Sequence, residues 1–490
     1  MPKFEIKHRR TGEVIFQGRA KFMKELLQSA VAAGREGSKS DEMMKMLKLK
    51  KSGKQMLYGA DLAGQDLSGV NLREGILTGA DMSKSNLTKT DLSLAALSGV
   101  NFSGATIDGT ILTDSDLSEA KLSGATVRAA RLDGANMTAA DLSNANLSNS
   151  KLTKTILLQA NMSGATLTSA DLARVQLSGN NLSKADLSWA FLTRSKLTNC
   201  NLSGADLEKA DLSGADLSGA DLAAARLVGA NLLGANLSKA NLRGAELGGA
   251  RLGGAVLQQA DLSGANLSGA YLEKTKFDSC NLSGANLSNV EMAGVMFIRC
   301  KLVGAQLSKS NLTGGALSNS DLRKAKMAKA VLAGVDLTGV QMSEADLTAA
   351  RLEEADLTGA NLVGVTAHGT RFDKAKMAGV DLSGADLTRA VLDNCDLSGA
   401  RMIKANLTET DLHGATLNGG DLSGSLLTDT KLSGANMTDV KMVAAALTNA
   451  DFSWVHLERA DLTKVKISGT SFRGAQLIEV IGVRFKKKDP

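Results

Sequence analysis

Residues 201–220 read NLSGADLEKADLSGADLSGA, and in this stretch a leucine falls at every fifth position, from Leu202 to Leu217. The spacing extends in both directions without a slip. From Leu57 to Leu477, every fifth residue is Leu, Met, Phe, Ile or Val, and Ala367 is the exception. A period of five fits neither an α-helix nor a flat strand. A short-repeat solenoid can bury such a stripe, because each coil packs only on its neighbours.

A second regularity surrounds each bulky residue. A small residue lies two positions before it, Asp or Asn commonly separates the two, and Ser or Thr often follows, as in Ala205-Asp206-Leu207. This pattern resembles the pentapeptide-repeat family over residues 57–477. The resemblance implies that four pentapeptides form one square coil of a right-handed parallel β-helix, with the bulky and small residues facing inward. We therefore expect an all-β solenoid of about 21 coils.

The first 56 residues differ from the repeats. Alternating residues at 3–8 and β-rich residues at 14–16 flank a turn and predict a hairpin, while apolar stripes at 20–33 and 40–51 predict two helices. A hairpin and helix before the repeats resemble the leader of many bacterial and phage members of the family. We interpret residues 1–56 as a small α+β capping or docking module. Residues 478–490 are predicted to leave the repeat register as a strand and a basic tail.

The positive charge is concentrated at the ends of the chain. The net charge is +6, yet residues 1–56 carry 14 basic and 6 acidic residues, whereas residues 57–477 carry 39 basic and 43 acidic ones. The second predicted helix has two interpretations. It either caps the first coil, since open strand edges invite aggregation, or it presents Lys48, Lys50 and Lys51 to an anionic partner or a membrane surface.

The chain contains no apolar signal segment at its start and no run of about eighteen apolar residues. We therefore expect no membrane span, and a location in the cytoplasm of a bacterium or in a virion.

Several core positions depart from leucine. Phenylalanines one coil apart should stack, and two such pairs occur, Phe277 with Phe297 and Phe452 with Phe472. Ala367 should leave a void beside the next bulky residue, Phe372, whose ring is expected to lean into it. The expected core ladder therefore includes Leu57, Leu207, Leu477 and these phenylalanines.

Four cysteines, Cys200, Cys280, Cys300 and Cys395, occupy the small inward position. A free cysteine behaves as a small apolar residue, so we expect them to replace alanine. Cys280 and Cys300 are one coil apart, but parallel side chains rarely reach disulfide torsions. No cysteine and histidine spacing typical of a metal site occurs.

A second period runs through the outward Asp/Asn position. Eight basic residues are spaced by 25, so they spiral around a coil of twenty: Arg226, Arg251, Lys276, Lys301, Lys326, Arg351, Lys376 and Arg401. Several should lie one coil from an acid, which avoids like charges on one face. The period is explained either by duplication of a unit that disperses charge or by a track for an anionic polymer.

The sequence offers no constellation for catalysis. The histidines, His8, His368, His413 and His456, share no site, and no phosphate-binding loop or nucleophile with its base occurs. We expect no enzyme activity, cofactor or metal. The outward Trp189 and Trp454 are candidate contact points.

Three functions compete. The first is a rigid spacer, scaffold or virion assembly component that binds a protein partner through residues 1–56, with end-to-end self-association as an option. The second follows from the resemblance, since some pentapeptide-repeat proteins mimic DNA and bind type II topoisomerases. The near-neutral repeats disfavour this function and make nucleic acid an unexpected partner. The third is a secreted effector that recruits a host protein.

Overall fold

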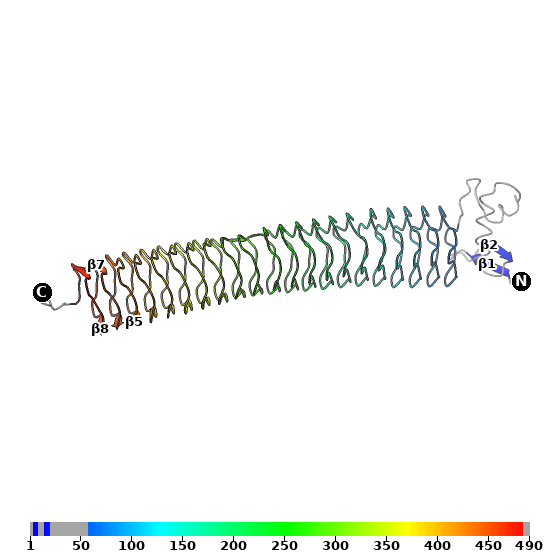
Figure 1. The fold of residues 1–490 in the computed structure, drawn as a ribbon. Helices are drawn as coiled ribbons and strands as arrows, with labels where there is room; N and C mark the ends of the chain where they lie inside the picture. Colours follow the sequence, from blue (N-terminus) through cyan, green and yellow to red (C-terminus); the bar gives the residue numbers. More distant parts are fainter. Residues whose placement is uncertain (1–2, 8–13, 20–56, 484–490) are drawn as a thin grey trace. The chain divides into compact units, whose positions relative to one another are not determined.

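The computed structural model describes residues 3–7, 14–19 and 57–483, and the remaining residues are drawn in grey in Figure 1. Within this part the chain contains no helix and nine short strands. The strands are β1 (Lys3–Lys7), β2 (Val14–Arg19), β3 (Lys276–Asp278), β4 (Met296–Ile298), β5 (Leu426–Thr428), β6 (Ala446–Thr448), β7 (His456–Glu458), β8 (Lys466–Ser468) and β9 (Gln476–Ile478). The predicted helices at 20–33 and 40–51, with Lys48, Lys50 and Lys51, lie outside the described residues, as does His8.

Strands β1 and β2 pair in antiparallel fashion, with Phe4 opposite Gly18 and Ile6 opposite Phe16. This hairpin touches the repeats through the backbone. The amide of Asp61 donates a hydrogen bond to the carbonyl of Lys7 over 2.8 Å. One coil later, the amide of Asp81 makes the equivalent bond to Ala60, also over 2.8 Å. The end of β1 therefore supplies an acceptor that a preceding coil would otherwise supply.

The chain divides into two compact units, Met1–Glu246 and Leu247–Pro490. Each unit contains stacked coils of twenty residues. We call the repeats of the first unit, residues 57–246, the first stack, and residues 247–483 the second stack. In the first stack, Asp61 pairs with Asp81 in parallel register, and the next three pentapeptides do the same. Because each coil of twenty residues makes four bridges, the coil has four sides. The predicted quadrilateral parallel β-solenoid is confirmed.

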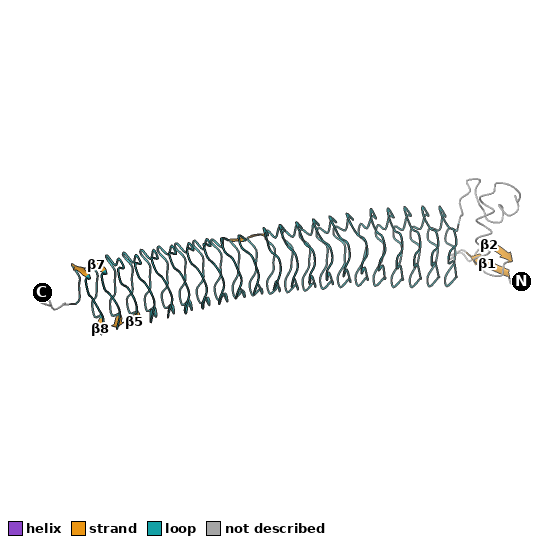
Figure 2. Cartoon of the chain, in the orientation of Figure 1, coloured by secondary structure: helices purple, strands orange, loops and turns teal. Residues whose placement is uncertain are grey.

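Most sides are too short to form a strand. Figure 2 shows loops and turns along most of both stacks, with strands β3 to β9 confined to the second. Two hydrogen bonds alternate at each side: Leu62 donates to Asp81 over 2.7 Å, and Asp81 donates to Ala60 over 2.8 Å. Proline, which has no amide hydrogen to donate, is absent between residues 57 and 483.

The corners are β-turns, and glycine recurs at one position of these turns. The amide of Ala60 bonds to the carbonyl of Leu57 three residues earlier over 3.1 Å, and Gly59 has a φ of 61°. A positive φ at the third residue defines a type II turn, which glycine adopts without cost. Other residues at this position adopt the same conformation, including Trp189 with a φ of 59°. Their side chains are therefore held outward at the corners.

The Asp/Asn position stabilises these corners. The carboxylate of Asp81 accepts a hydrogen bond from the amide of Ser83 over 3.0 Å, two residues on. It also accepts one from the side-chain amide of Asn101 on the next coil, over 3.0 Å. An Asp or Asn side chain that bonds to the backbone two residues later forms an Asx-turn. The consensus Asp or Asn thus stabilises both the turn of its own coil and the contact with the next coil.

The bulky and small residues fill the interior of both stacks. Leu57 is 6% exposed, and Leu207, Ala367 and Phe372 are fully buried. Each buried bulky side chain contributes roughly 1.5–3 kcal/mol. The rings of Phe277 and Phe297 stack, with centroids 4.6 Å apart and planes at 21°, while those of Phe452 and Phe472 lie 5.2 Å apart at 33°.

The last described coil deviates from the sequence expectation in two ways. Phe472 and Leu477 are half-buried and not fully buried, because no described coil covers them. The expectation that the register ends at Leu477 is wrong for the backbone. Ile481 bridges Asp461 and donates to Ala460 over 2.9 Å. The register persists because backbone pairing does not require a bulky inward side chain.

Candidate functional site

The two outward tryptophans lie on corners and have different neighbours. Trp189, in the first stack, is 53% exposed, and the ammonium of Lys209 lies 4.4 Å from the centroid of a ring of its indole. This geometry is a cation–π contact, which stabilises by about 0.5–1 kcal/mol at an exposed site. Trp454, in the second stack, is 67% exposed, and its ring lies over Gly474, where a Cβ would come within 2.6 Å. The two tryptophans belong to different stacks, and each has its own local neighbours.

Two of the described histidines, His413 and His456, have polar partners at the surface. The Nδ1 atom of His413 lies 2.9 Å from the hydroxyl of Ser433, and Nε2 of His456 lies 3.4 Å from the carboxylate of Glu458. Within the described residues, no three His, Cys, Asp or Glu side chains gather closely enough to hold a metal ion.

All four cysteines are buried and free. The thiol of Cys200 donates to the carbonyl of Leu177 over 2.7 Å, and that of Cys395 to Phe372 over 2.8 Å. Threonine uses the same position in the same way, since Thr90 donates to Leu67 over 2.8 Å. Burial raises the pKa of Cys200 to about 11 and that of Cys395 to about 12. A thiol is a nucleophile only as the thiolate, so these cysteines have a packing role.

Cys280 and Cys300 occupy neighbouring coils of the second stack without forming a disulfide. The hydrogen-bond contact with Cys300 raises the pKa of Cys280, and burial raises it further. The thiol of Cys280 donates to the carbonyl of Leu257 over 2.7 Å. These two residues are therefore also part of the core.

The basic residues with the 25-residue spacing are paired with acids in several cases. Arg401 lies 3.5 Å from Asp381, and Lys376 lies 3.9 Å from Asp356. Further pairings, also in the Asp/Asn position, are Arg226 with Asp206 at 3.1 Å, Lys301 opposite Asp321, and Lys326 opposite Asp346. Charge dispersal therefore accounts for these members of the series, as one of the two interpretations expects.

Two arginines at corners of the second stack are also paired with acids. Arg389 lies 2.7 Å from Glu409 on the next coil, and Arg459 lies 2.7 Å from Asp439 on the preceding coil. Both pairs are exposed, and such pairs contribute little to stability. In these two pairs, opposite charges on neighbouring coils attract each other.

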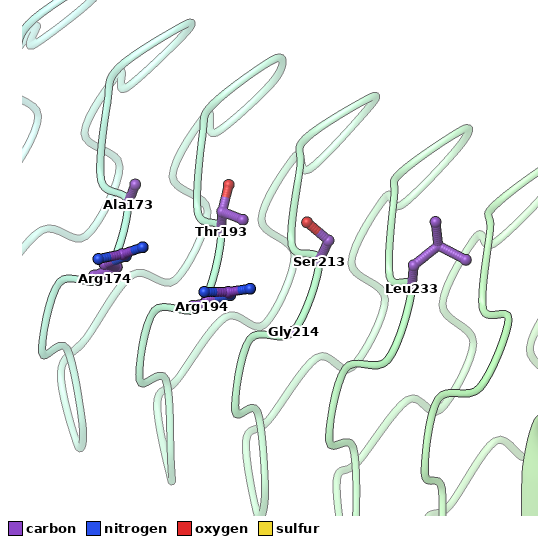
Figure 3. Close-up of a pocket in the computed structure, with 7 residues that line it drawn as sticks. All are labelled: Ala173, Arg174, Thr193, Arg194, Ser213, Gly214 and Leu233. Carbon is purple, nitrogen blue, oxygen red and sulfur yellow. The ribbon is translucent and has the colours of Figure 1, made fainter.

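Two arginines in the first stack lie one coil apart without an acidic partner among the described residues, and sequence reasoning missed them. Arg174 and Arg194 lie on the same corner of neighbouring coils and line a surface pocket of about 600 Å³. Figure 3 shows the two guanidinium groups in the same orientation on successive coils. The remaining lining residues carry no charge: Ala173, Thr193, Ser213, Gly214 and Leu233. The twenty-residue spacing of Lys154, Arg174 and Arg194 was the signal that could have identified this site.

The model of the family described as pentapeptide repeats matches successive, partly overlapping segments from residue 57 to residue 481. The chain therefore belongs to the pentapeptide-repeat family, whose solenoids are generally non-enzymatic. Among the described residues, no helix is long and apolar enough to cross a bilayer.

Solved pentapeptide-repeat structures are similar to parts of the chain. HetL, involved in heterocyst differentiation regulation in the cyanobacterium Nostoc sp. Strain PCC 7120, is 28% identical over 40% of this chain and 91% of HetL, with a TM-score of 0.28. QnrB1, a plasmid-mediated fluoroquinolone resistance protein, is 21% identical over 41% of this chain and 89% of QnrB1, with a TM-score of 0.23. No curated protein matches the chain at a significant level.

Proposed function

We propose that this protein is a non-enzymatic structural scaffold, a spacer or assembly component that engages a protein partner through residues 1–56. One observation carries the proposal. Within each stack, coil after coil keeps the same twenty-residue bridge spacing, without an inserted loop. Binding specificity in solenoids commonly resides in insertions on one face. Because the repeats carry none, the non-repetitive module is the natural place for a partner.

The backbone contact of β1 supports this division of roles. The hydrogen bond from Asp61 to Lys7 joins the hairpin to the first coil over 2.8 Å. Such a contact occupies a backbone group that an open edge would leave unpaired, and an open edge invites aggregation. The module then acts both as a cap and as the docking end of the scaffold. A bacterial cytoplasm or a virion is the setting in which we place this scaffold.

The test is cross-linking mass spectrometry of the full chain captured with its partner. We expect the cross-links to the partner to fall in residues 1–56, and the change of Lys48, Lys50 and Lys51 to glutamate to abolish capture. A matched variant with Lys309 and Lys329 changed to glutamate should capture the partner normally. Cross-links confined to residues 57–483 would refute the N-terminal docking role.

A second assay separates the scaffold from the DNA mimic. The full chain at micromolar concentration should leave DNA gyrase supercoiling unchanged, because residues 57–477 carry 39 basic and 43 acidic residues and lack the field of a polyanion. Inhibition of supercoiling would replace the scaffold with the topoisomerase-binding alternative.

A further inference from the structure

The arginine pair lies in a basic region of an otherwise acidic stack. Residues 57–246 carry 16 basic and 19 acidic residues, whereas residues 151–200 within them carry 6 basic and 2 acidic ones. Five of these six basic residues lie at or beside the corner that Arg174 and Arg194 occupy: Lys151, Lys154, Arg174, Arg194 and Lys196. All five are exposed. The charge is therefore concentrated where the pocket opens.

The backbone fixes the positions from which the two arginine side chains extend. The amide of Arg174 donates to Thr193 over 2.9 Å, and the amide of Arg194 donates to Ser213 over 2.9 Å. Their φ angles are 60° and 55°, the left-handed conformation of the corner. Because each turn is fixed by the next coil, the two side chains start from preorganised positions one coil apart, about 4.8 Å along the stack.

No acid neutralises this pair. Within the described part of the chain, neither guanidinium forms a salt bridge. Seven arginines and one lysine elsewhere on the two stacks do pair with an acid. The second stack provides the contrast. Arg351 and Arg371 are also one coil apart, and the carboxylate of Glu353 lies 3.1 Å from the first and 3.4 Å from the second. Like charges facing each other on neighbouring strands destabilise a sheet, so the uncompensated pair has an energetic cost that a ligand would offset.

The neighbourhood selects the kind of ligand. Two guanidinium forks recognise carboxylates or phosphates with two hydrogen bonds each. The exposed ring of Phe191, 53% accessible and three residues before Arg194, adds an apolar contact. Arginine and aromatic residues together are typical of protein-binding hot spots. Asp171 and Asp211 lie on the adjoining side. Their carboxylates would repel a long polyanion that extends past the two arginines. A short acidic segment would not extend that far.

We infer that Arg174 and Arg194, with Lys154 and Phe191, form a docking site for a short acidic segment of a partner protein. Two carboxylates of that segment bind the two guanidinium groups over the pocket, and an apolar residue beside them packs on Phe191. The site is independent of residues 1–56, so the scaffold proposal can fail while this one holds.

Fluorescence anisotropy with the full chain tests the site. The probes are labelled hexaglutamate and a labelled Glu-Glu-Leu-Glu-Glu peptide, in low salt and in about 150 mM NaCl, where surface attraction is screened. We expect both peptides to bind, and the double change Arg174→Ser and Arg194→Ser to weaken binding at least tenfold. The matched double change Arg351→Ser and Arg371→Ser removes the same charge and should alter affinity less than twofold.

Three further arms make the result decisive. Thr193→Glu places a carboxylate in the pocket and should weaken both peptides about tenfold, whereas Thr193→Gln should not. Phe191→Ser should weaken the leucine-containing peptide and leave hexaglutamate unchanged. Circular dichroism checks that each variant folds. Absence of peptide binding, equal loss in both arginine double variants, or arginine-dependent binding of a twelve-residue oligothymidylate in place of the peptides would overturn the assignment.

Discussion

The first and second stacks share one backbone plan, yet they treat stacked arginines in opposite ways. Arg174 and Arg194 face an uncharged pocket, while Arg371 lies 3.4 Å from Glu353 and 3.3 Å from Asp373. The fold dictates the spacing of both pairs and therefore cannot explain the difference. The outward residues, which the core does not constrain, decide whether a pair is neutralised within the chain or left for a ligand.

The interiors differ as well. The inward positions of the first stack contain one phenylalanine, Phe102, whereas those of the second contain Phe277, Phe297, Phe372, Phe452 and Phe472. Four of these rings stack in pairs between adjacent coils, Phe277 with Phe297 and Phe452 with Phe472. Among the described residues, the second stack therefore has aromatic stacking in its core, and the first, with a single inward phenylalanine, does not.

The largest expected effect concerns these rings. Phe297→Ala should destabilise the second stack by about 3–5 kcal/mol, because a buried ring is lost and a cavity remains. The double change with Phe277→Ala should reveal a coupling of about 0.5–1.5 kcal/mol from the lost stacking. Differential scanning calorimetry of the single and double variants measures both quantities. Phe102→Ala is the control in the first stack, and strict additivity of the two changes at 277 and 297 would contradict the stacking.

A smaller difference should separate Phe372→Leu from Phe102→Leu. Both rings are fully buried, but Ala367 should leave space that the ring of Phe372 fills. We expect the loss at Phe372 to exceed that at Phe102 by about 1 kcal/mol, the scale of one buried methylene. Thermal melting of the two variants checks this expectation, and equal losses would show that Ala367 leaves no such space.

Substitution of the neighbouring acids should make the second arginine pair resemble the first. The double change Glu353→Gln and Asp373→Asn removes the acids beside Arg351 and Arg371 and should destabilise the protein by about 1 kcal/mol or less, since both arginines are half exposed. The same variant should gain a second binding site for hexaglutamate. Anisotropy titration counts the sites, and an unchanged stoichiometry would show that the neutralising acids are not what distinguishes the two pairs.

The smallest expected effect is a salt-dependent change in the pKa of a carboxylate, which should differ between charged and neutral hydrogen-bond partners. The hydrogen bond from Arg323 lowers the pKa of Asp321 in the second stack, against the effect of burial. In the first stack, burial opposes the hydrogen bonds from Ser188 and Thr168, which lower the pKa of Asp186. About 1 M NaCl should raise the pKa of Asp321 toward its usual value and leave Asp186 unchanged, because salt screens charges and not neutral hydrogen bonds.

Carbon-detected NMR titration of the carboxylates measures both pKa values. Because each pKa is lowered on folding, each group stabilises the protein above its unfolded pKa, near pH ~4, and loses that contribution as the pH falls through its folded pKa. Equal salt responses of the two residues would contradict the distinction between charged and neutral partners.

The sequence predicted the interior of the molecule far better than its surface. The five-residue period predicted which residues face inward, such as Leu207, and the resemblance to the pentapeptide-repeat family implied the coil of twenty residues that the bridges confirm. The pairing of Phe277 with Phe297 followed directly from that number. The pocket at Arg174 was not predicted. The five-residue period does not show which outward residues are neighbours, and these emerge only when residues twenty apart are compared. The burial of Phe472 was overestimated, since burial at the last described coil depends on neighbours and not on the repeat.

The turn of twenty residues also determines which changes in length the protein tolerates. Gain or loss of four pentapeptides would return every later residue to its own column, so the ion pairs and the arginine pocket would keep their alignment. Gain or loss of one pentapeptide would leave the leucine stripe inside but rotate all later columns by a quarter turn. A single small duplication can therefore rearrange the charges of a surface while the interior stays as it was.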